Sequence, residues 1–317
     1  MPPPRPTLIV RLRNWVGDVT LGLPTLQRLD DAGFELQLVG KGWARELLAG
    51  HGWPVTVLAK SLPDRVRQLR ALRRQAQAAD PGFGRRLNAV CFPYSFSSAL
   101  DMRLAGLRAI GHAHEGRGLL LGRSVARPAG RHEIEVYWQL GSELLGADAP
   151  LPPRIDLRVA PRHAEAAQAL RERHAIAPGY LVICPFAGGT FEGLDKTWPD
   201  FADFARHELA AFGRDVVVVP GPGEEALARE RFASAKRLEG VNLGVYAALL
   251  RDAALMVSND TGPGHVAAAL GTPLLSVLGP SDPAQWRAWG PSVRLLQGAG
   301  GWPGRGQVRD AVAAVLA

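Results

Sequence analysis

The sequence predicts an α/β protein with two doubly wound domains, each a parallel sheet covered by helices. Its 317 residues exceed what one core usually absorbs, so two domains of about 150 residues each are expected. Short apolar, β-branched runs alternate with helical patterns in both halves, which is typical of βαβ units. The cluster Ala149-Pro150-Leu151-Pro152-Pro153 cannot continue a helix and indicates a linker. We therefore place the domains at residues 1–153 and 154–317.

The predicted elements alternate along each domain. Strands of the first domain are predicted at residues 7–12, 34–39, 55–58, 87–92 and 107–110, with helices at 19–31, 43–49, 63–78 and 97–104. In the second domain we expect strands near 180–184, 215–219, 255–258 and 274–278, with helices at 162–174, 199–212, 224–232, 245–251 and 264–270. A last helix at 308–316 belongs to the second domain, and its packing back on the first is left open. Since ligands of such sheets bind at the carboxyl ends of strands, we expect a site in a cleft between the domains.

The charge composition of the chain indicates which classes of partner to expect. The net charge of +7 is carried almost wholly by arginine and favours anionic partners such as nucleotides, nucleic acid or an anionic lipid surface. Ordinary solvation of the surface explains it as well, and a GC-rich genome would also favour arginine. No nucleic-acid motif or clustered basic helix stands out, so nucleic acid is not expected.

Cysteine usage and hydropathy point to the cytoplasm. Cys91 and Cys184 lie in apolar runs without a disulfide framework or metal-ligand spacing. The pair His112 and His114 lacks a third ligand, so no metal site is expected. The apolar run at the start is too short for a signal peptide, and no run of about 18 apolar residues occurs after it. We predict a cytoplasmic protein with, at most, peripheral contact with the inner face of the membrane.

The segment 256–286 is the strongest candidate site. It predicts a strand, a polar turn, a helix that starts near Pro263 and a second strand. Asp260 or Thr261 can cap that helix, whose first free amides would then form a site for a diphosphate. Asp260 itself would accept sugar or ribose hydroxyls or fix the loop. An ordinary capped helix between two buried strands explains the local pattern equally well.

Two further turns contain candidate ligand-binding or catalytic residues. In segment 181–199, Gly188-Gly189-Thr190 lets backbone amides approach a ligand, and Lys196 offers a charge for phosphate oxygens, although a solvated lysine fits equally. The first turn, 11–18, holds one glycine, which argues against a dinucleotide fingerprint. Asp18 there is a candidate general base, and a plain helix N-cap is its simpler local explanation. Glu224 is by default a first-turn helix residue at another strand exit.

Six motifs in order resemble one family. They are N-W-V-G-D at 14–18, S-F-S-S-A at 95–99, E-G-R at 115–117, D-K-T-W-P at 195–199, S-N-D-T-G-P-G-H at 258–265 and G-P-S-D-P at 279–283. Together they resemble the ADP-heptose:lipopolysaccharide heptosyltransferases of glycosyltransferase family 9, over residues 7–290. The resemblance implies a GT-B fold and inverting, metal- and cofactor-independent transfer of heptose from ADP-heptose to an anionic, lipid-linked inner-core acceptor.

The resemblance also assigns roles. It implies that Asp18 is the base and that Lys196 binds the diphosphate. It assigns the donor to Thr190, Glu224 (with Glu225 as the alternative), Asp260, Thr261, Gly262 and His265, and the acceptor to Asn14, Ser97 and Arg117. Two other hypotheses stay open: a GT-B transferase or epimerase that uses a UDP- or GDP-sugar, and a non-catalytic nucleotide- or glycan-binding module.

Overall fold

The computed structural model describes residues 5–317 except 189, 192, 280–281 and 300. The chain divides into two compact units, Met1–Arg45 with Gly52–Pro152 and Glu46–His51 with Pro153–Ala317. The division differs from a single cut near residue 153 because the short segment Glu46–His51 groups with the second unit. Within the described residues, no helix is long and apolar enough to cross a membrane.

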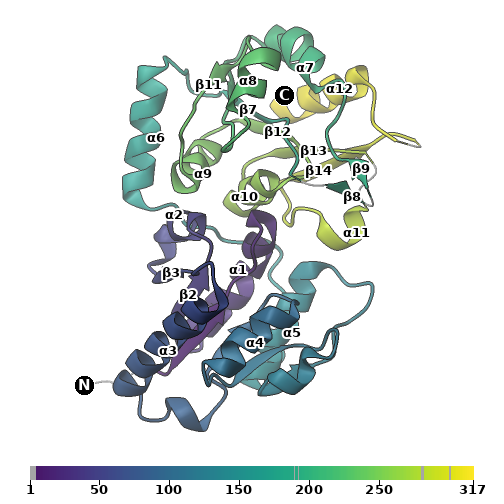
Figure 1. Ribbon diagram of the computed structural model, residues 1–317. Coiled ribbons are helices and arrows are strands. Elements are labelled where there is room, and N and C mark those ends of the chain that lie inside the picture. Colours follow the sequence, from purple (N-terminus) through teal and green to yellow (C-terminus); the bar gives the residue numbers. More distant parts are fainter. Residues whose placement is uncertain (1–4, 189, 192, 280–281, 300) are drawn as a thin grey trace. The chain divides into compact units, whose positions relative to one another are not determined.

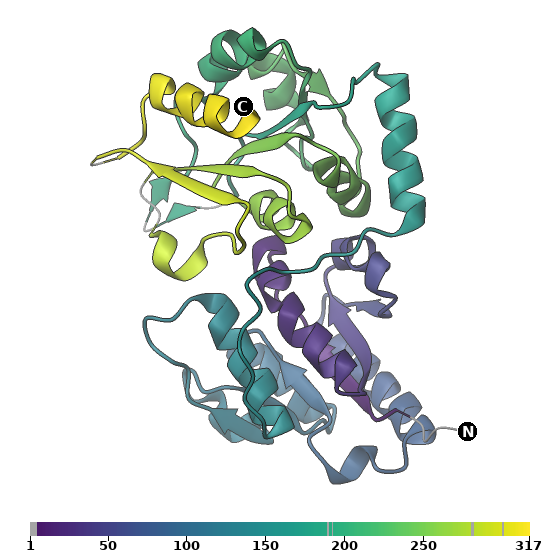
Figure 2. The ribbon, with the colours of Figure 1, turned by 180° about the vertical axis from the view of Figure 1, so that it is seen from behind.

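The first unit is a six-stranded parallel sheet in the order β3-β2-β1-β4-β5-β6. Its strands are β1 (Thr7–Arg11), β2 (Glu35–Gly40), β3 (Val55–Val57), β4 (Ala89–Cys91), β5 (Ala109–His112) and β6 (Arg123–Val125). Its helices are α1 (Val16–Asp31), α2 (Trp43–Leu47, whose end belongs to the second unit), α3 (Leu62–Ala79), α4 (Phe96–Leu104) and α5 (Glu133–Leu145), with short turns η2 (Phe83–Arg85) and η3 (Arg117–Leu120). Helices α3 and α4 pack against each other over one face, and α1 packs against α5 over the other (Figures 1 and 2).

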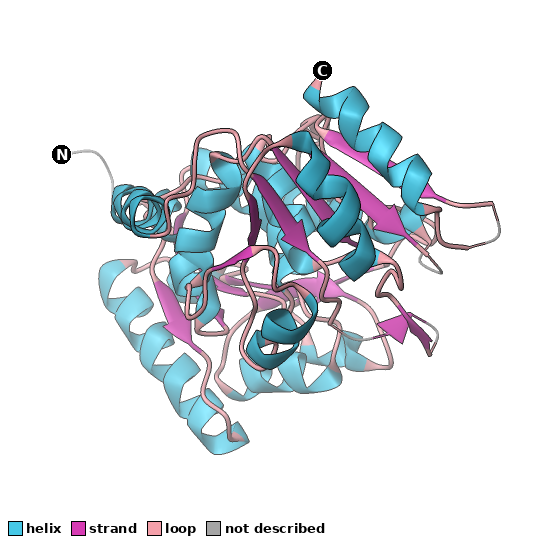
Figure 3. Cartoon of the chain, turned by 90° about the horizontal axis from the view of Figure 1, so that it is seen from above, coloured by secondary structure: helices cyan, strands magenta, loops and turns pink. Residues whose placement is uncertain are grey.

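The second unit repeats this topology with the strand order β11-β10-β7-β12-β13-β14, again parallel throughout. Its strands are β7 (Leu181–Cys184), β10 (Val216–Val218), β11 (Lys236–Arg237), β12 (Leu255–Asn259), β13 (Leu274–Leu278) and β14 (Val293–Gln297), beside the hairpin β8 (Thr190–Phe191) and β9 (Leu194–Asp195). Its helices are α6 (Pro161–Arg173), α7 (Phe201–Phe204), α8 (Glu225–Arg231), α9 (Leu243–Arg251), α10 (Gly262–Leu270), α11 (Pro283–Trp286) and α12 (Arg305–Leu316), with turns η1 (Ala49–His51), η4 (Ala205–Leu209) and η5 (Ala210–Phe212). Figure 3 shows the strands between layers of helices. These two helix-covered parallel sheets confirm the predicted fold class.

Local signals explain where several helices begin. The side chains of Ser61, Ser95 and Asn242 accept hydrogen bonds from backbone amides at the starts of α3, α4 and α9. His132 caps α5 in the same way, with Glu135 completing a capping box. Because these caps lie at the ends of loops, they fix the places where the chain enters each helix.

The last helix packs within its own unit. Val308 and Val312 of α12 are fully buried in the core that also contains Leu275 and Val277 of β13. The stretch predicted as one helix over 199–212 is instead α7 followed by a π-turn and a 3₁₀-turn.

Candidate active site

Asp18 lies in the first turn of α1 and is buried, with 7% of its surface exposed. The helix starts at Val16, and Trp15 is its N-cap residue. Asp18 is therefore not the N-cap that the simpler local explanation required. Its Oδ1 accepts a hydrogen bond from the Tyr137 hydroxyl at 3.0 Å and one from Arg13 Nη2 at 3.4 Å. Both described bonds end on Oδ1, which leaves Oδ2 as the oxygen suited to take a proton.

The surroundings of Asp18 favour a base. Burial is the main reason why the pKa of Asp18 is raised above its ordinary value, and the charge of Glu133 raises it further. Arg13 and the Tyr137 hydroxyl oppose this rise of the pKa because both stabilise the carboxylate. A poorly solvated carboxylate with a raised pKa is what general-base catalysis near neutral pH requires.

A second layer of side chains holds Arg13. Its guanidinium stacks on the Tyr94 ring, 4.4 Å from the centroid, and Arg127 lies 4.7 Å from the same centroid. Glu133 is fully buried, pairs with Arg127 at 2.9 Å and accepts a hydrogen bond from the Tyr94 hydroxyl. No sequence motif indicates Tyr137, Arg13 or Tyr94, and the sequence pattern does not predict the helix α5, which supplies Tyr137.

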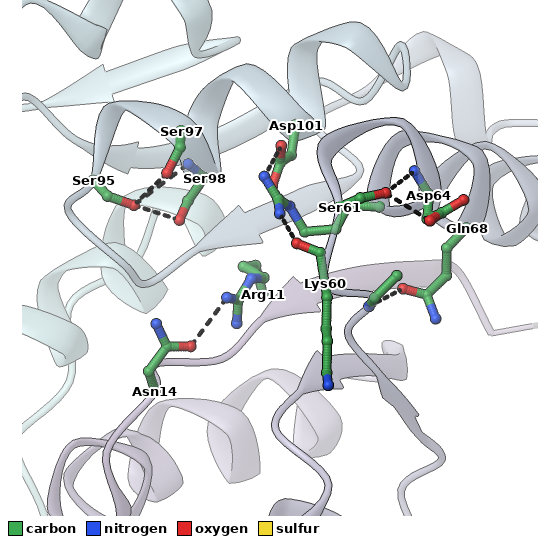
Figure 4. Close-up of polar contacts among 12 residues, drawn as sticks. Arg11, Asn14, Lys60, Ser61, Asp64, Gln68, Ser95, Ser97, Ser98 and Asp101 are labelled. Atoms are coloured by element: carbon green, nitrogen blue, oxygen red, sulfur yellow. Dashed lines mark hydrogen bonds and ion pairs between the residues drawn. The ribbon is translucent and has the colours of Figure 1, made fainter.

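The predicted acceptor residues lie at the carboxyl edge of the first sheet, in two different environments. Asn14 and Ser97 are exposed; Asn14 accepts a hydrogen bond from Arg11 at 3.1 Å, and Ser97 donates to the Ser95 hydroxyl at 3.3 Å (Figure 4). Arg117 is fully buried and donates to the carbonyl oxygens of Pro93 and, at 3.2 Å, Ser95. Its position supports the loop before α4 rather than offering its guanidinium to an acceptor.

An exposed cation that belongs to no sequence motif, Lys60, lies in the same region. Lys60 follows β3, and Figure 4 shows it with Asn14 and Ser97 on three segments that leave β3, β1 and β4. Arg65 fixes the backbone there, donating to the Lys60 carbonyl at 2.7 Å and to Asp101 at 2.6 Å. The charge of Lys60 would attract an anionic ligand at this edge.

In the second unit the structure brings Lys196 and Asp260 together. Lys196 Nζ lies 3.0 Å from Asp260 Oδ2, and the two side chains are 19% and 16% exposed. Lys196 follows the hairpin β8–β9, whereas Asp260 follows β12, so the pair joins two separate strand exits. An ammonium group held in this way stays close to the start of α10.

The start of α10 provides backbone amides. Thr261 is its N-cap residue, yet neither it nor Asp260 caps an amide through its side chain; the Thr261 hydroxyl lies 3.6 Å from Cys184 Sγ instead. Gly262 opens the helix and His265 is buried in its first turn. At Gly264 an added Cβ would lie 3.0 Å from Ser258 Oγ, so glycine allows the helix to approach β12. This helix end is suited to a diphosphate by its dipole and amides.

Asn259 links the two parts of this region. Its buried amide accepts a hydrogen bond from the Trp198 backbone N–H at 3.1 Å and donates one to the Pro185 carbonyl at 2.6 Å. Pro185 and Trp198 bound the segment that carries Lys196. Although Asn259 stands inside the motif that the sequence pointed to, no role was predicted for it.

The remaining predicted donor residues lie in other segments of the second unit, in the turn after β10 and in β8. Glu224 Oε2 accepts from the Gly221 N–H at 2.7 Å, Glu225 Oε2 accepts from the Gly223 N–H at 2.8 Å, and burial raises the pKa of Glu224. Both carboxylates thus fold onto the turn after β10, beside β7 in the sheet. Thr190 lies in β8, and its side chain is outside the described residues, as is Gly189. No group of three or more His, Cys, Asp and Glu in the described residues could hold a metal.

Comparisons with known proteins show which family this chain resembles. A family model described as "Glycosyltransferase family 9 (heptosyltransferase)" matches residues 88–305. Among curated proteins, lipopolysaccharide heptosyltransferase 3 of Escherichia coli is 34% identical over 127 residues, which cover 36% of this chain and 35% of that protein. The chain thus matches about a third of the length of that relative.

Solved structures match over nearly the whole chain. E. coli ADP-heptose lps heptosyltransferase II has a TM-score of 0.81 at 22% identity, covering 98% of both chains. A glycosyl transferase family 9 protein from Veillonella parvula has a TM-score of 0.80 at 17% identity, covering 98% of this chain and 97% of that one. The E. coli heptosyltransferase WaaC with ADP has a TM-score of 0.70 at 21% identity, covering 98% and 99%. These likenesses show the fold, which is the predicted GT-B architecture.

Proposed function

Because the chain belongs to glycosyltransferase family 9, the heptosyltransferase family, we propose that it transfers heptose from ADP-heptose to a lipid-linked inner-core saccharide of lipopolysaccharide. The observation that carries the proposal is the pairing of Lys196 with Asp260 beside the start of α10. A cation and a helix N-terminus together suit the diphosphate of a nucleotide sugar. The curated and structural relatives named for heptose transfer support the choice of sugar and nucleotide.

The reaction we propose is a single displacement. The Oδ2 oxygen of Asp18 takes the proton from an acceptor hydroxyl, and the hydroxyl oxygen bonds to the anomeric carbon of heptose as the bond from this carbon to the diphosphate breaks. Attack on the side opposite the leaving group inverts the anomeric centre. The electron pair of the broken bond leaves with ADP, whose added charge Lys196 and the α10 amides offset. We propose that the step needs no metal ion, since these groups supply the positive charge.

On the acceptor side we propose that Asn14, Lys60 and Ser97 contact the saccharide. Hydroxyl and amide groups suit sugar hydroxyls, and the Lys60 cation suits the carboxylates or phosphates of an anionic acceptor. The donor is water-soluble while the acceptor is lipid-linked, so we place the protein in the cytoplasm with peripheral contact to the membrane.

Release of ADP tests the proposal. We expect ADP to appear from ADP-heptose only when an inner-core acceptor is added, and to appear at the same rate with a chelator present. A thermal-shift comparison of ADP, UDP and GDP adds a second test, because a bound nucleotide raises the melting temperature by mass action. Stabilisation by UDP or GDP in place of ADP would instead favour another nucleotide sugar, and binding without transfer would indicate a non-catalytic module.

A further inference from the structure

The excess positive charge is confined to one of the two units. The first unit holds 20 Lys and Arg against 12 Asp and Glu, whereas the second holds 17 against 18. A genomic bias towards arginine acts on the whole chain, so it cannot explain why one unit is basic and the other is balanced. The excess therefore points to a partner of the first unit.

Part of this charge gathers on α3, η2, α4 and the segment after α4; we call it the α3–α4 basic surface and define it by Arg70, Arg73, Arg74, Arg85, Arg103 and Arg108. Three of these arginines lie on α3, so the expectation that the chain has no clustered basic helix was wrong. Arg70 donates to the Leu104 carbonyl at 3.1 Å, at the end of α4. The Arg73 guanidinium lies so close to Gly106 that an added Cβ would be 2.7 Å from it. Arg108 donates to the Arg85 carbonyl at 3.3 Å. These contacts join α3 to the end of α4, and η2 to the segment between α4 and β5.

Carboxylates do not neutralise this surface. No ion pair among the described residues includes any of the six arginines. The acidic residues of the neighbouring elements are already paired with other arginines: Asp64 with Arg67 at 2.7 Å, Asp101 with Arg65 at 2.6 Å, and Asp80 with Arg86. The positive charge of these six arginines is therefore not offset by a paired carboxylate among the described residues, and it can attract an external anion.

The chemistry of the surface favours a lipid bilayer over nucleic acid. Leu104, between Arg103 and the Arg73 contact, is 45% exposed, and an apolar side chain among arginines suits the boundary between headgroups and acyl chains. Single-stranded nucleic acid is usually held by stacking aromatic rings. The exposed aromatic residues of this unit, Trp15 and Phe96, lie instead at the starts of α1 and α4.

We propose that the α3–α4 basic surface docks on the anionic phospholipid surface of a membrane. The choice of a bilayer rests on the proposed function, because a lipid-linked acceptor is presented there. Docking would keep the first unit, with its acceptor-side residues, at the membrane while the soluble donor binds the second unit.

Vesicle co-sedimentation tests the proposal. We expect the full chain to bind phosphatidylglycerol–phosphatidylcholine vesicles and not pure phosphatidylcholine vesicles, with binding lost at high salt. The triple variant Arg70→Gln, Arg74→Gln, Arg103→Gln should bind on the order of 100-fold more weakly, given the contribution of each basic residue near an anionic surface. The matched control is Arg173→Gln, Arg206→Gln, Arg231→Gln, which removes the same charge from exposed sites of the second unit and should bind as the wild type does.

Several results would overturn the proposal: no binding of the wild type to anionic vesicles, equal losses in the two triple variants, or displacement of bound vesicles by single-stranded RNA at a similar concentration. Transfer to an acceptor dispersed in detergent separates this proposal from the proposed function. The α3–α4 variant should keep that activity. Vesicle binding without any transfer would contradict the proposed function and leave the docking surface intact.

Discussion

The two units share one topology and differ in the segments that come after their first strands. In each, the central strand is the first of its unit, β1 or β7, and the next strands are added on both sides in the same order. After β1, four residues lead into α1, whose first turn carries Asp18. After β7, the chain runs through the hairpin β8–β9 and Lys196 before α7. Equivalent places in one topology thus carry a carboxylate in one unit and a cation in the other.

This difference separates two kinds of chemistry. Asp18 is buried under Tyr137 and Arg13, which suits proton transfer, while Lys196 and Asp260 keep part of their surface exposed beside a helix end, which suits an anionic ligand. The fold supplies the carboxyl edge of a parallel sheet, and the segment after each strand supplies the function. Variants in each unit test whether the first unit acts on protons and the second on the donor.

The largest effect is expected for Asp18→Asn. An amide cannot take the acceptor proton, so turnover should fall by about 1,000-fold, within the usual range for general bases. Affinity for ADP, measured by calorimetry, should stay unchanged because the residues that we propose bind the donor belong to the second unit. Near-normal turnover, or a parallel loss of ADP binding, would show that Asp18 is not the base.

The same variant has an expected effect on stability. The pKa of Asp18 is raised in the folded protein, so the folded state binds this proton more tightly than the unfolded state does. The free energy of unfolding of the wild type therefore falls as the pH rises from the unfolded pKa through the folded pKa. Asp18→Asn escapes this loss. Unfolding by urea should therefore show the variant gaining relative to the wild type as the pH is raised from about 4 to about 8.

Lys196→Met should have the next largest effect. Removing the charge that we propose faces the diphosphate should lower kcat/KM for the donor by about 100-fold and weaken ADP binding. Asp260→Asn should cost less in the wild type and almost nothing in the Lys196→Met background, since the 3.0 Å pair no longer exists there. Additive effects in this double-mutant cycle would contradict a functional coupling of the two residues.

The sequence alone predicts the parts of this site that depend on local patterns. Strands β7, β12 and β13 are nearly continuous apolar runs because both faces of a parallel sheet are covered, and they were predicted within a residue or two. The helix α10 was predicted from the turn and Pro263 near its start. Edge strands such as β6 were missed, because a partly exposed strand with Arg123 and Ser124 lacks that pattern.

Local sequence patterns do not predict which residues make long-range contacts or which side chains become buried. Tyr137 bonds to Asp18 across 119 positions of the chain, and nothing near either residue indicates the other. Arg117 stands in a motif and resembles a surface cation, yet the fold buries it beneath a loop. The start of α1 was placed three residues late because Trp15 makes no side-chain cap. The motifs therefore indicate which segments follow the carboxyl ends of the strands, whereas tertiary packing determines which of their side chains are exposed there.

A smaller effect is expected for Asn259→Ala. It leaves the Trp198 N–H and the Pro185 carbonyl without partners, which should lower the free energy of unfolding by about 2 kcal/mol. If Asn259 also positions Lys196, the KM for the donor should rise about tenfold while the KM for the acceptor stays unchanged, a split worth about 1.4 kcal/mol in donor binding.

The control is Asn242→Ala, which removes the cap of α9, another asparagine that accepts from backbone amides. It should cost about 1 kcal/mol of stability and leave both KM values unchanged. Equal rises of the donor KM in both variants would mean that Asn259 acts on stability alone.

The smallest effect is expected for Tyr137→Phe, which removes the hydroxyl that donates to Asp18 at 3.0 Å. This hydrogen bond stabilises the carboxylate, so its loss should raise the pKa of Asp18 further. The acid limb of the profile of kcat/KM against pH should then move to higher pH. Activity should fall about threefold to tenfold on the acid limb and remain close to that of the wild type on the plateau.

The matched control is Tyr180→Phe, which removes a buried hydroxyl that donates to the Leu249 carbonyl in the second unit. It should destabilise the protein without moving the limb. An identical shift in both variants, or none in Tyr137→Phe, would show that proton chemistry does not depend on the surroundings of Asp18, and the proposed division between the units would lose its basis.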